Sequence, residues 1–117
     1  MMKEDKETAR HLPLSEATYC ILLALAEPLH GYGIMQKVEA GSAGAVRLGP
    51  GTLYGALTKL QQQGLIERTG ETEEAGERRK LYVLTPLGRE VVRLEQERLV
   101  DMASIGEELS GIPRRSS

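Results

Sequence analysis

The sequence contains a single cysteine, Cys20, and this scarcity excludes an internal disulfide. A reducing cytoplasm is therefore the expected location. Cys20 lies in the apolar run TYCILLALA, where no neighbouring charge would lower the pKa of a thiol. We expect a buried structural thiol rather than a nucleophile.

Long apolar runs are also missing. The longest run is too short to span a bilayer, and the opening MMKEDKETARHL has charges but no apolar centre, so we expect neither a transmembrane helix nor a signal peptide. The two histidines, His11 and His30, are far apart, and no second thiol or helix-spaced carboxylate joins them as a metal ligand. Nucleophile elbows and phosphate-binding loops are absent too, so we expect no metal, no cofactor and no enzyme activity.

The composition is that of one small globular domain, with 117 residues of which 40% are apolar and 27% charged. A net charge of -2 argues against a protein that coats nucleic acid by bulk charge. The charges are unevenly distributed, because residues 47–89 have seven Lys/Arg against five Glu, whereas residues 90–109 have two against six acidic residues. We therefore expect different surfaces to meet different partners.

The stretch GPGTLYGALTKLQQQGL, residues 49–65, predicts a short amphipathic helix. Pro50 favours its start, and Gly64 favours its end. Apolar residues recur at helical spacing and predict a buried stripe made of Leu53, Leu57 and Leu60. The remaining positions are polar or small and include no carboxylate, which suits a surface that contacts phosphates and base edges. An ordinary solvated helix face is the alternative.

The rest of the chain predicts a mainly α (α+β) fold. Breakers and periodicity indicate a helix between Ser15 and Pro28, a second helix at 31–40 and a three-residue strand at 46–48. Strand-like segments at 65–69 and 79–84 follow, joined by about ten charged residues that predict a hairpin with a long exposed tip. A helix capped by Thr85 should then run over residues 86–109.

This order of elements is typical of a winged helix-turn-helix. We expect a flexible arm at 1–12, the DNA-binding domain at 13–85, a dimerisation helix at 86–109 and a flexible tail at 110–117. The third helix would enter a major groove, and cations beside the hairpin tip would contact phosphates, namely Arg68, Arg78, Arg79 and Lys80. The tip glutamates leave three alternatives: they point away from DNA, the wing is mobile, or the wing contacts little.

The last helix has two apolar stripes. Leu87, Val91 and Leu94 are predicted to face the domain's own core. A second, rotated stripe has no partner within so small a domain, and it consists of Val92, Leu99, Met102, Ile105 and Leu109. A second copy of the same helix is the simplest partner, so we expect a homodimer.

The segments HGYGIMQKV, GPGTLYGALTKLQQQGLIER and ERRKLYVLTPLGRE resemble the signature segments of the PadR family of bacterial transcriptional regulators. The resemblance runs from Leu14 to the end of the sequence, and the single C-terminal helix is similar to that of the short PadR subfamily. It implies a dimeric repressor of nearby genes that a small phenolic or drug-like molecule, or another cue, releases from double-stranded operator DNA.

Position by position, the resemblance places Thr52, Tyr54 and Lys59 on the recognition helix and Tyr32 near the DNA backbone. Thr58, a polar residue off the buried stripe, is a further candidate DNA contact. Tyr54 could contact a phosphate or brace the recognition helix against the wing, and Tyr82 is predicted to pack in the core. An effector is expected at the dimer interface. The sequence lacks Trp and Phe, so stacking of flat aromatic drugs on a tryptophan, as in some short members, is not expected.

A protein-interaction module is the rival interpretation. The acidic pI of about 5.7 and the glutamate-rich tip would allow a winged-helix scaffold that binds a protein instead of DNA.

Overall fold

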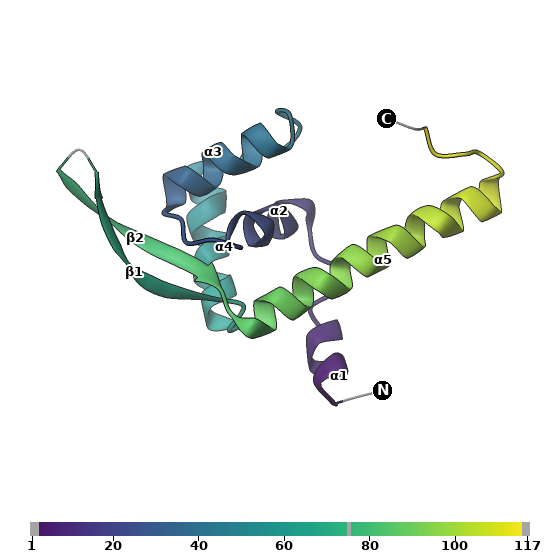
Figure 1. Ribbon diagram of the computed structural model, residues 1–117, viewed down its shortest axis with the longest axis horizontal. Helices are drawn as coiled ribbons and strands as arrows, with labels where there is room; N and C mark the ends of the chain where they lie inside the picture. The colour runs from purple at the N-terminus through teal and green to yellow at the C-terminus, as the bar shows by residue number, and fades with distance from the viewer. Residues whose placement is uncertain (1–2, 75, 116–117) are drawn as a thin grey trace.

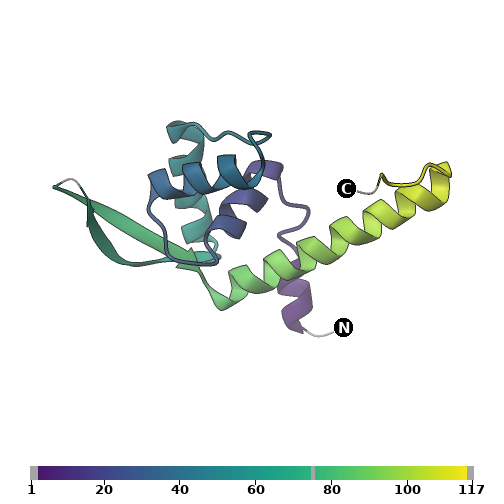
Figure 2. The same cartoon turned by 45° about the horizontal axis from the view of Figure 1, so that its top comes forward.

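The computed structural model describes residues 3–74 and 76–115. Three helices form the centre of the molecule, a hairpin projects from one side and a long helix from the other (Figures 1 and 2). The elements in chain order are α1 (Lys3–Ala9), α2 (Glu16–Ala24), α3 (Gly31–Gly41), α4 (Pro50–Gln62), β1 (Ile66–Glu74), β2 (Glu77–Leu84) and α5 (Pro86–Ser110). The mainly helical winged helix-turn-helix predicted from the sequence is confirmed.

The core lies where α2, α3, α4, the base of the hairpin and the start of α5 meet. The apolar stripe of α4 faces it as predicted, since Leu53, Leu57 and Leu60 are each at most 2% exposed. Tyr82 packs against the same core from β2, which confirms its predicted role. Burial of these aliphatic side chains supplies the main stabilisation of the domain.

Side-chain caps start the helices where the sequence predicts them. Ser15 Oγ accepts a hydrogen bond from the Thr18 amide at 3.1 Å, and Thr85 Oγ1 accepts one from the Gly88 amide at 3.0 Å. His30 caps α3 in the same way, because its Nδ1 accepts the Gly33 amide hydrogen at 3.1 Å.

The end of α4 is joined tightly to the start of α5. Thr85 donates twice across this junction, from its amide to the Leu65 carbonyl at 3.1 Å and from its hydroxyl to the Gly64 carbonyl at 2.6 Å. A Cβ atom at Gly88 would lie 2.0 Å from the Leu65 carbonyl oxygen, so only glycine permits this approach.

The hairpin differs from its prediction, because most of the expected tip loop is regular β-ladder. The pairing runs from Ile66 opposite Leu84 to Glu74 opposite Glu77, with a bulge between Arg68 and Gly70. Cross-strand pairs of opposite charge extend the ladder, with Glu71 opposite Lys80 and Glu73 opposite Arg78. Pairing of this kind has no apolar alternation, which explains why the sequence pattern missed it.

The strand predicted at 46–48 is a loop. The hydroxyl of Ser42 accepts a hydrogen bond from the Val46 amide at 3.0 Å, which turns the chain immediately after α3. The hairpin finds its additional backbone partner in the α2–α3 loop instead. Leu29 and Tyr82 exchange two backbone hydrogen bonds, at 3.1 and 2.9 Å.

Residues 3–9, expected within a flexible arm, form helix α1, which lies against α5 (Figure 1). Thr8 is only 1% exposed, and the Leu14 amide donates to Glu95 Oε2 on α5 at 2.7 Å. So short a helix depends on tertiary contacts, which α5 supplies here. Residues 1 and 2 of the expected arm lie outside the described residues.

Helix α5 changes its surroundings along its length. Its first three turns are packed, with Val91 fully buried and Glu95 1% exposed. Val92, predicted on the outward stripe, packs against the core instead, because it lies in this first part. Beyond it, α5 extends away from the other elements and ends at Ser110, after which Gly111 adopts a φ of +70° (Figure 1).

Residues 111–115 have no regular secondary structure, and residues 116 and 117 of the expected tail lie outside the described part of the chain. None of the helices in the described residues combines the length and apolar character that crossing a bilayer requires. The same residues contain no cluster of three or more His, Cys, Asp or Glu side chains placed to hold a metal ion.

Candidate nucleic-acid interface

The face of α4 opposite its buried stripe is polar and accessible. It exposes no carboxylate and carries Thr52, Tyr54, Thr58, Lys59, Gln61 and Gln62. Thr58 donates its hydroxyl hydrogen to the Tyr54 carbonyl at 3.0 Å, which leaves its oxygen as an acceptor and its methyl group as an apolar contact. Such a set can hydrogen-bond to base edges and to phosphates without electrostatic repulsion.

Tyr54 lies across the N-terminus of α3. A Cβ atom at Gly31 would be 2.5 Å from the Tyr54 hydroxyl oxygen, so glycine makes room for this ring. The sequence predicted either a phosphate contact or a brace between the recognition helix and the wing. The structure shows that the ring contacts the start of α3, and the phosphate contact stays a prediction. The side chain is still 52% exposed, and its hydroxyl sits near a helix N-terminus, where anions are favoured.

A cleft of about 510 Å³, which we call the wing cleft, separates α3 and α4 from β2. It brings together five of the predicted DNA contacts, because Tyr32, Tyr54, Arg78, Arg79 and Lys80 all line it. Its other lining residues are His30, Gly31, Glu77 and Tyr82.

Arg79 is turned toward α3 rather than toward solvent. Its guanidinium lies 5.8 Å from the centroid of the Tyr32 ring and 3.8 Å from a carboxylate oxygen of Glu77. Its side chain is 30% exposed, against 80% for Arg78, because neighbouring residues of a strand point to opposite faces. Arg79 therefore holds the wing against α3, while Arg78 is the accessible cation.

Two further arginines of the wing, Arg68 and Arg78, also lie close to a glutamate, whereas Lys80 forms no ion pair within the described residues. Glu71 contacts Arg68 at 2.5 Å and Arg78 at 3.8 Å. Between residues 66 and 84 there are five Glu against four Lys/Arg, so the wing as a whole is slightly acidic. The three alternatives that the sequence left for these glutamates stay open, and the structure adds that Glu71 and Glu73 lie in the ladder opposite Lys80 and Arg78.

His30 adds a contact that the sequence did not indicate. Its Nε2 lies 3.5 Å from Glu74 Oε1 at the far end of β1, while its Nδ1 caps α3. The ring thus connects the outer part of the wing to the start of α3.

A model of the transcriptional regulator PadR-like family matches residues 21–94, which run from the second half of α2 to the packed start of α5. The chain belongs to the PadR-like family. Membership of this family confirms the prediction that the protein is a transcriptional regulator that binds DNA and not an enzyme. The winged helix-turn-helix is the part of the protein that binds DNA.

Relatives and solved structures extend this match. An uncharacterised 37.1 kDa protein of a Streptomyces fradiae transposon is 44% identical over 82 residues, which are 69% of this chain and 22% of that protein. The chain thus spans about a fifth of that relative. A Streptococcus mutans structure is 30% identical, with a TM-score of 0.63 over 85% of this chain and 91% of that one.

Two further structures are PadR proteins. That from Eggerthella lenta is 25% identical, with a TM-score of 0.66 over 80% of this chain and 81% of that chain. Bacillus subtilis PadR, solved in complex with operator DNA, is 24% identical with a TM-score of 0.59, over 75% of this chain and 49% of that one. At this identity the B. subtilis structure supports the fold.

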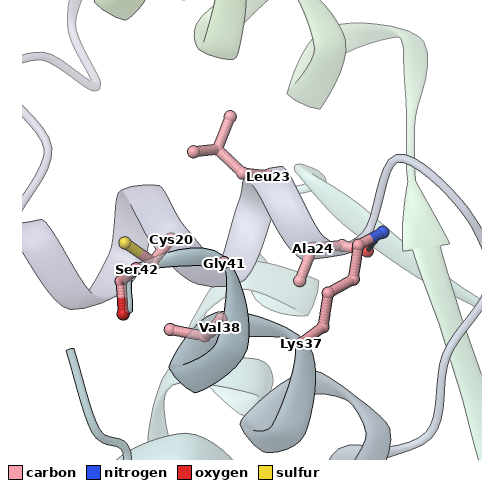
Figure 3. Close-up of a pocket in the computed structure, with 7 residues that line it drawn as sticks. All are labelled: Cys20, Leu23, Ala24, Lys37, Val38, Gly41 and Ser42. Atoms are coloured by element: carbon pink, nitrogen blue, oxygen red, sulfur yellow. Dashed lines mark hydrogen bonds between the residues drawn. The ribbon is translucent and has the colours of Figure 1, made fainter. Parts of the chain in front are cut away.

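An apolar hollow of about 220 Å³ lies between α2 and α3 of this PadR fold (Figure 3). Lys37 extends along it toward Ala24, whose carbonyl accepts its Nζ hydrogen at 3.1 Å, while Leu23 points away from α3. Cys20 is half-buried here rather than fully buried. Burial, followed by the nearby Glu16 carboxylate, raises the pKa of this thiol, so it stays protonated at neutral pH. The hollow shares no residue with the wing cleft.

The distal part of α5 exposes four large apolar side chains at helical spacing, which we call the apolar row. Leu99, Met102 and Ile105 are 41%, 50% and 46% exposed, and Leu109 is 83% exposed. No other described element lies alongside this part of α5 (Figures 1 and 2). Exposed apolar rows of this kind are typical of a surface that a partner covers.

Proposed function

We propose that this PadR-like protein is a homodimeric repressor that binds a pseudo-palindromic operator with one α4 helix in each of two successive major grooves. The observation that carries the proposal is the exposed face of α4, which is polar, free of carboxylates and held rigidly on the core by its buried stripe. The solved complex of B. subtilis PadR with operator DNA supports this use of the fold. The regulator would act in the cytoplasm.

The interface residues divide into two roles. Thr52, Thr58 and Lys59 would face base edges and nearby phosphates from α4. The hydroxyls of Tyr32 and Tyr54, together with Arg78 and Lys80, would meet the DNA backbone at the wing cleft. Arg68 would add a backbone contact at the base of the wing, whereas Arg79 would position the wing.

The apolar row supports dimerisation. Two α5 helices packed through Leu99, Met102, Ile105 and Leu109 would bury side chains that are otherwise exposed. A two-fold axis through this interface would place the two α4 helices one turn of DNA apart, at about 34–36 Å.

We also propose that an effector acts on this dimer. A molecule bound between the two α5 helices would meet the aliphatic side chains of Leu99, Met102 and Ile105. These side chains fit an aliphatic or compact apolar ligand better than a flat aromatic one, because they offer no ring for stacking.

Binding to the DNA upstream of its own gene tests the repressor. Fluorescence anisotropy would be recorded over a salt series, with an unrelated duplex of equal length as the control. A repressor binds the upstream duplex far more tightly, with a steep salt dependence. Equal, weak binding to both duplexes by a folded dimer would contradict the proposal.

An adaptor that binds a protein is the second candidate, and the acidic wing favours it. The two functions differ in their response to Lys59→Ala. A repressor loses affinity and salt dependence with this change, whereas an adaptor binds its protein partner unchanged.

A further inference from the structure

A second cleft, of about 270 Å³, lies on the other side of α4 from the wing, and we call it the N-terminal cleft. Arg10, His11 and Thr18 line one wall, and Lys59 and Leu60 of α4, with the C-cap residue Gln63, line the other. Lys59 and Gln63 share a side of α4 because they are four residues apart. The cleft thus joins the segment before α2 to the C-terminal half of the recognition helix.

The charge of this cleft is unbalanced. The described residues that line it include two basic side chains, Arg10 and Lys59, and no aspartate or glutamate. Neither cation forms an ion pair within the described chain, in contrast to Arg68, Arg78 and Arg79 of the wing. An arginine and a lysine at one concave site favour a carboxylate or phosphate group.

Two polar groups of the cleft have unused hydrogen-bonding capacity. The Ser15 hydroxyl donates to Thr18 Oγ1 at 2.9 Å, so the hydrogen of the Thr18 hydroxyl is available to another acceptor. The Nε2 atom of His11 is buried and has no hydrogen-bond partner among the described residues. A buried ring nitrogen without a partner is unfavourable, and a bound molecule would relieve this.

The rest of the lining is aliphatic, with Leu14, Leu60 and Leu65 among its side chains. A ligand that matches both the basic and the aliphatic part of the cleft has one anionic end and a short aliphatic tail. The cavity volume limits this ligand to a small molecule. The described lining contains no Phe, Tyr or Trp on which an aromatic tail could stack, which favours an aliphatic tail.

We propose that the N-terminal cleft binds a small organic anion with an aliphatic tail between Arg10 and Lys59. Because Lys59 is also a proposed DNA contact, the bound anion competes with DNA for its ammonium group; this second step rests on the proposed function. The site is separate from the interface between α5 helices, so the dimer has two such clefts, each beside one recognition helix.

Hexanoate is a suitable probe, with 1-hexanol as its uncharged counterpart. Titration into ¹⁵N-labelled full-length protein at constant ionic strength should give saturable NMR shifts in residues 10–18 and 56–65. A ligand of about eight non-hydrogen atoms should bind with a Kd of about 1 mM. No saturable shift, or an equal response to hexanol, overturns the site.

Substitutions locate the ligand within the cleft. Arg10→Ala should weaken hexanoate about tenfold, the equivalent of 1.4 kcal/mol. Gln63→Glu should weaken it to a similar degree by adding a negative charge, without removing any of the cations. Arg114→Ala, which removes an exposed arginine near Glu107 on the far end of the chain, is the matched control and should change nothing. An unchanged Kd in both cleft variants, with preserved amide spectra, overturns the assignment.

Competition with DNA is tested by operator titration with and without hexanoate, with chloride replacing it in the control. Wild-type protein should lose operator affinity as hexanoate saturates, whereas Arg10→Ala should bind the operator normally and respond about tenfold less to hexanoate. Hexanoate binding without any change in operator affinity overturns the competition. If the protein fails to bind DNA at all, the proposed function fails, and the NMR titration still decides whether the cleft binds anions.

Discussion

Helix α4 and the arginines of the wing both suit DNA, but of their cations only that of the helix lacks a neighbouring carboxylate partner among the described residues. Lys59 on α4 has no ion pair within the described residues, whereas the arginines of the wing lie beside glutamates of the same hairpin. A paired cation must exchange a carboxylate for a phosphate, which reduces its net contribution to binding. The contribution of a cation to DNA binding therefore depends on whether a carboxylate already pairs with it, as well as on its presence.

Disrupting the proposed dimer should have the largest effect, because it would separate the two copies of each region. Leu99→Glu would place an unpaired carboxylate in the α5 interface, so we expect a monomer by light scattering. Operator affinity should fall about 100-fold or more, since the second half-site is no longer tethered. Ser104→Glu lies on the opposite side of α5 and is the matched control. A dimer retained by Leu99→Glu would contradict the assignment of the apolar row.

Removing one cation from each region compares them directly. Lys59→Ala should reduce operator affinity about tenfold and the salt slope by about 1. Arg78→Ala should produce less than half this change in slope, because Glu71 already compensates its charge. Salt-dependent anisotropy measures both variants side by side. Equal losses would show that the wing arginine is as available as the lysine.

Removing the carboxylate that pairs with the wing arginines should make these cations as available to DNA as Lys59 of the helix. Glu71→Gln releases Arg68 and Arg78 while it preserves the shape of the side chain. We expect operator affinity to rise by severalfold and the salt slope to steepen by about 1. Glu67→Gln removes the same charge from an exposed position of β1 that forms no ion pair within the described chain, and it should change the slope less. An identical response to the two substitutions would show that the change in net charge, and not the release of the arginines, causes the effect.

The smallest effect is expected at the wing cleft, where Tyr54 of α4 contacts the start of α3. Gly31→Ala would displace the Tyr54 hydroxyl, which is the movable end of a half-exposed side chain, so the fold should persist. Operator affinity should fall about threefold, in line with the loss of one neutral hydrogen bond of about 0.7 kcal/mol. Gly41→Ala, at the other end of α3, meets no atom within 4 Å and serves as the control. Unchanged affinity for Gly31→Ala would exclude Tyr54 from the interface.

Local signals explain which parts of this structure could be predicted. The caps Ser15 and Thr85 and the stripe of α4 depend on residues within a few positions of each other, so the sequence displays them directly. The candidate site was predicted by type and by resemblance, and the wing cleft collects five of its residues. That Arg79 lies over Tyr32 was not predictable, because the two residues are distant in sequence.

The remaining differences have long-range causes. Helix α1 depends on contact with α5, and the linker after it is held by the bond between the Leu14 amide and Glu95, 81 positions away. Glu95 looks like any exposed glutamate of an amphipathic helix, yet it is buried and pairs with Arg98. Its hydrogen bond to Arg98 is the main reason that the pKa of its carboxyl group is lowered. No periodic pattern distinguishes it from its neighbours.

The junction between α4 and α5 has a consequence for operator length. Because Thr85 and Gly88 fix the first turn of α5 to the end of α4, the recognition helix follows any change in the direction of α5. A helix of 25 residues is about 37 Å long, so a tilt of about 5° displaces its far end by roughly 3 Å, close to the 3.4 Å rise of one base pair. The crossing angle of two α5 helices would therefore determine, to about one base pair, the spacing of half-sites that the protein accepts.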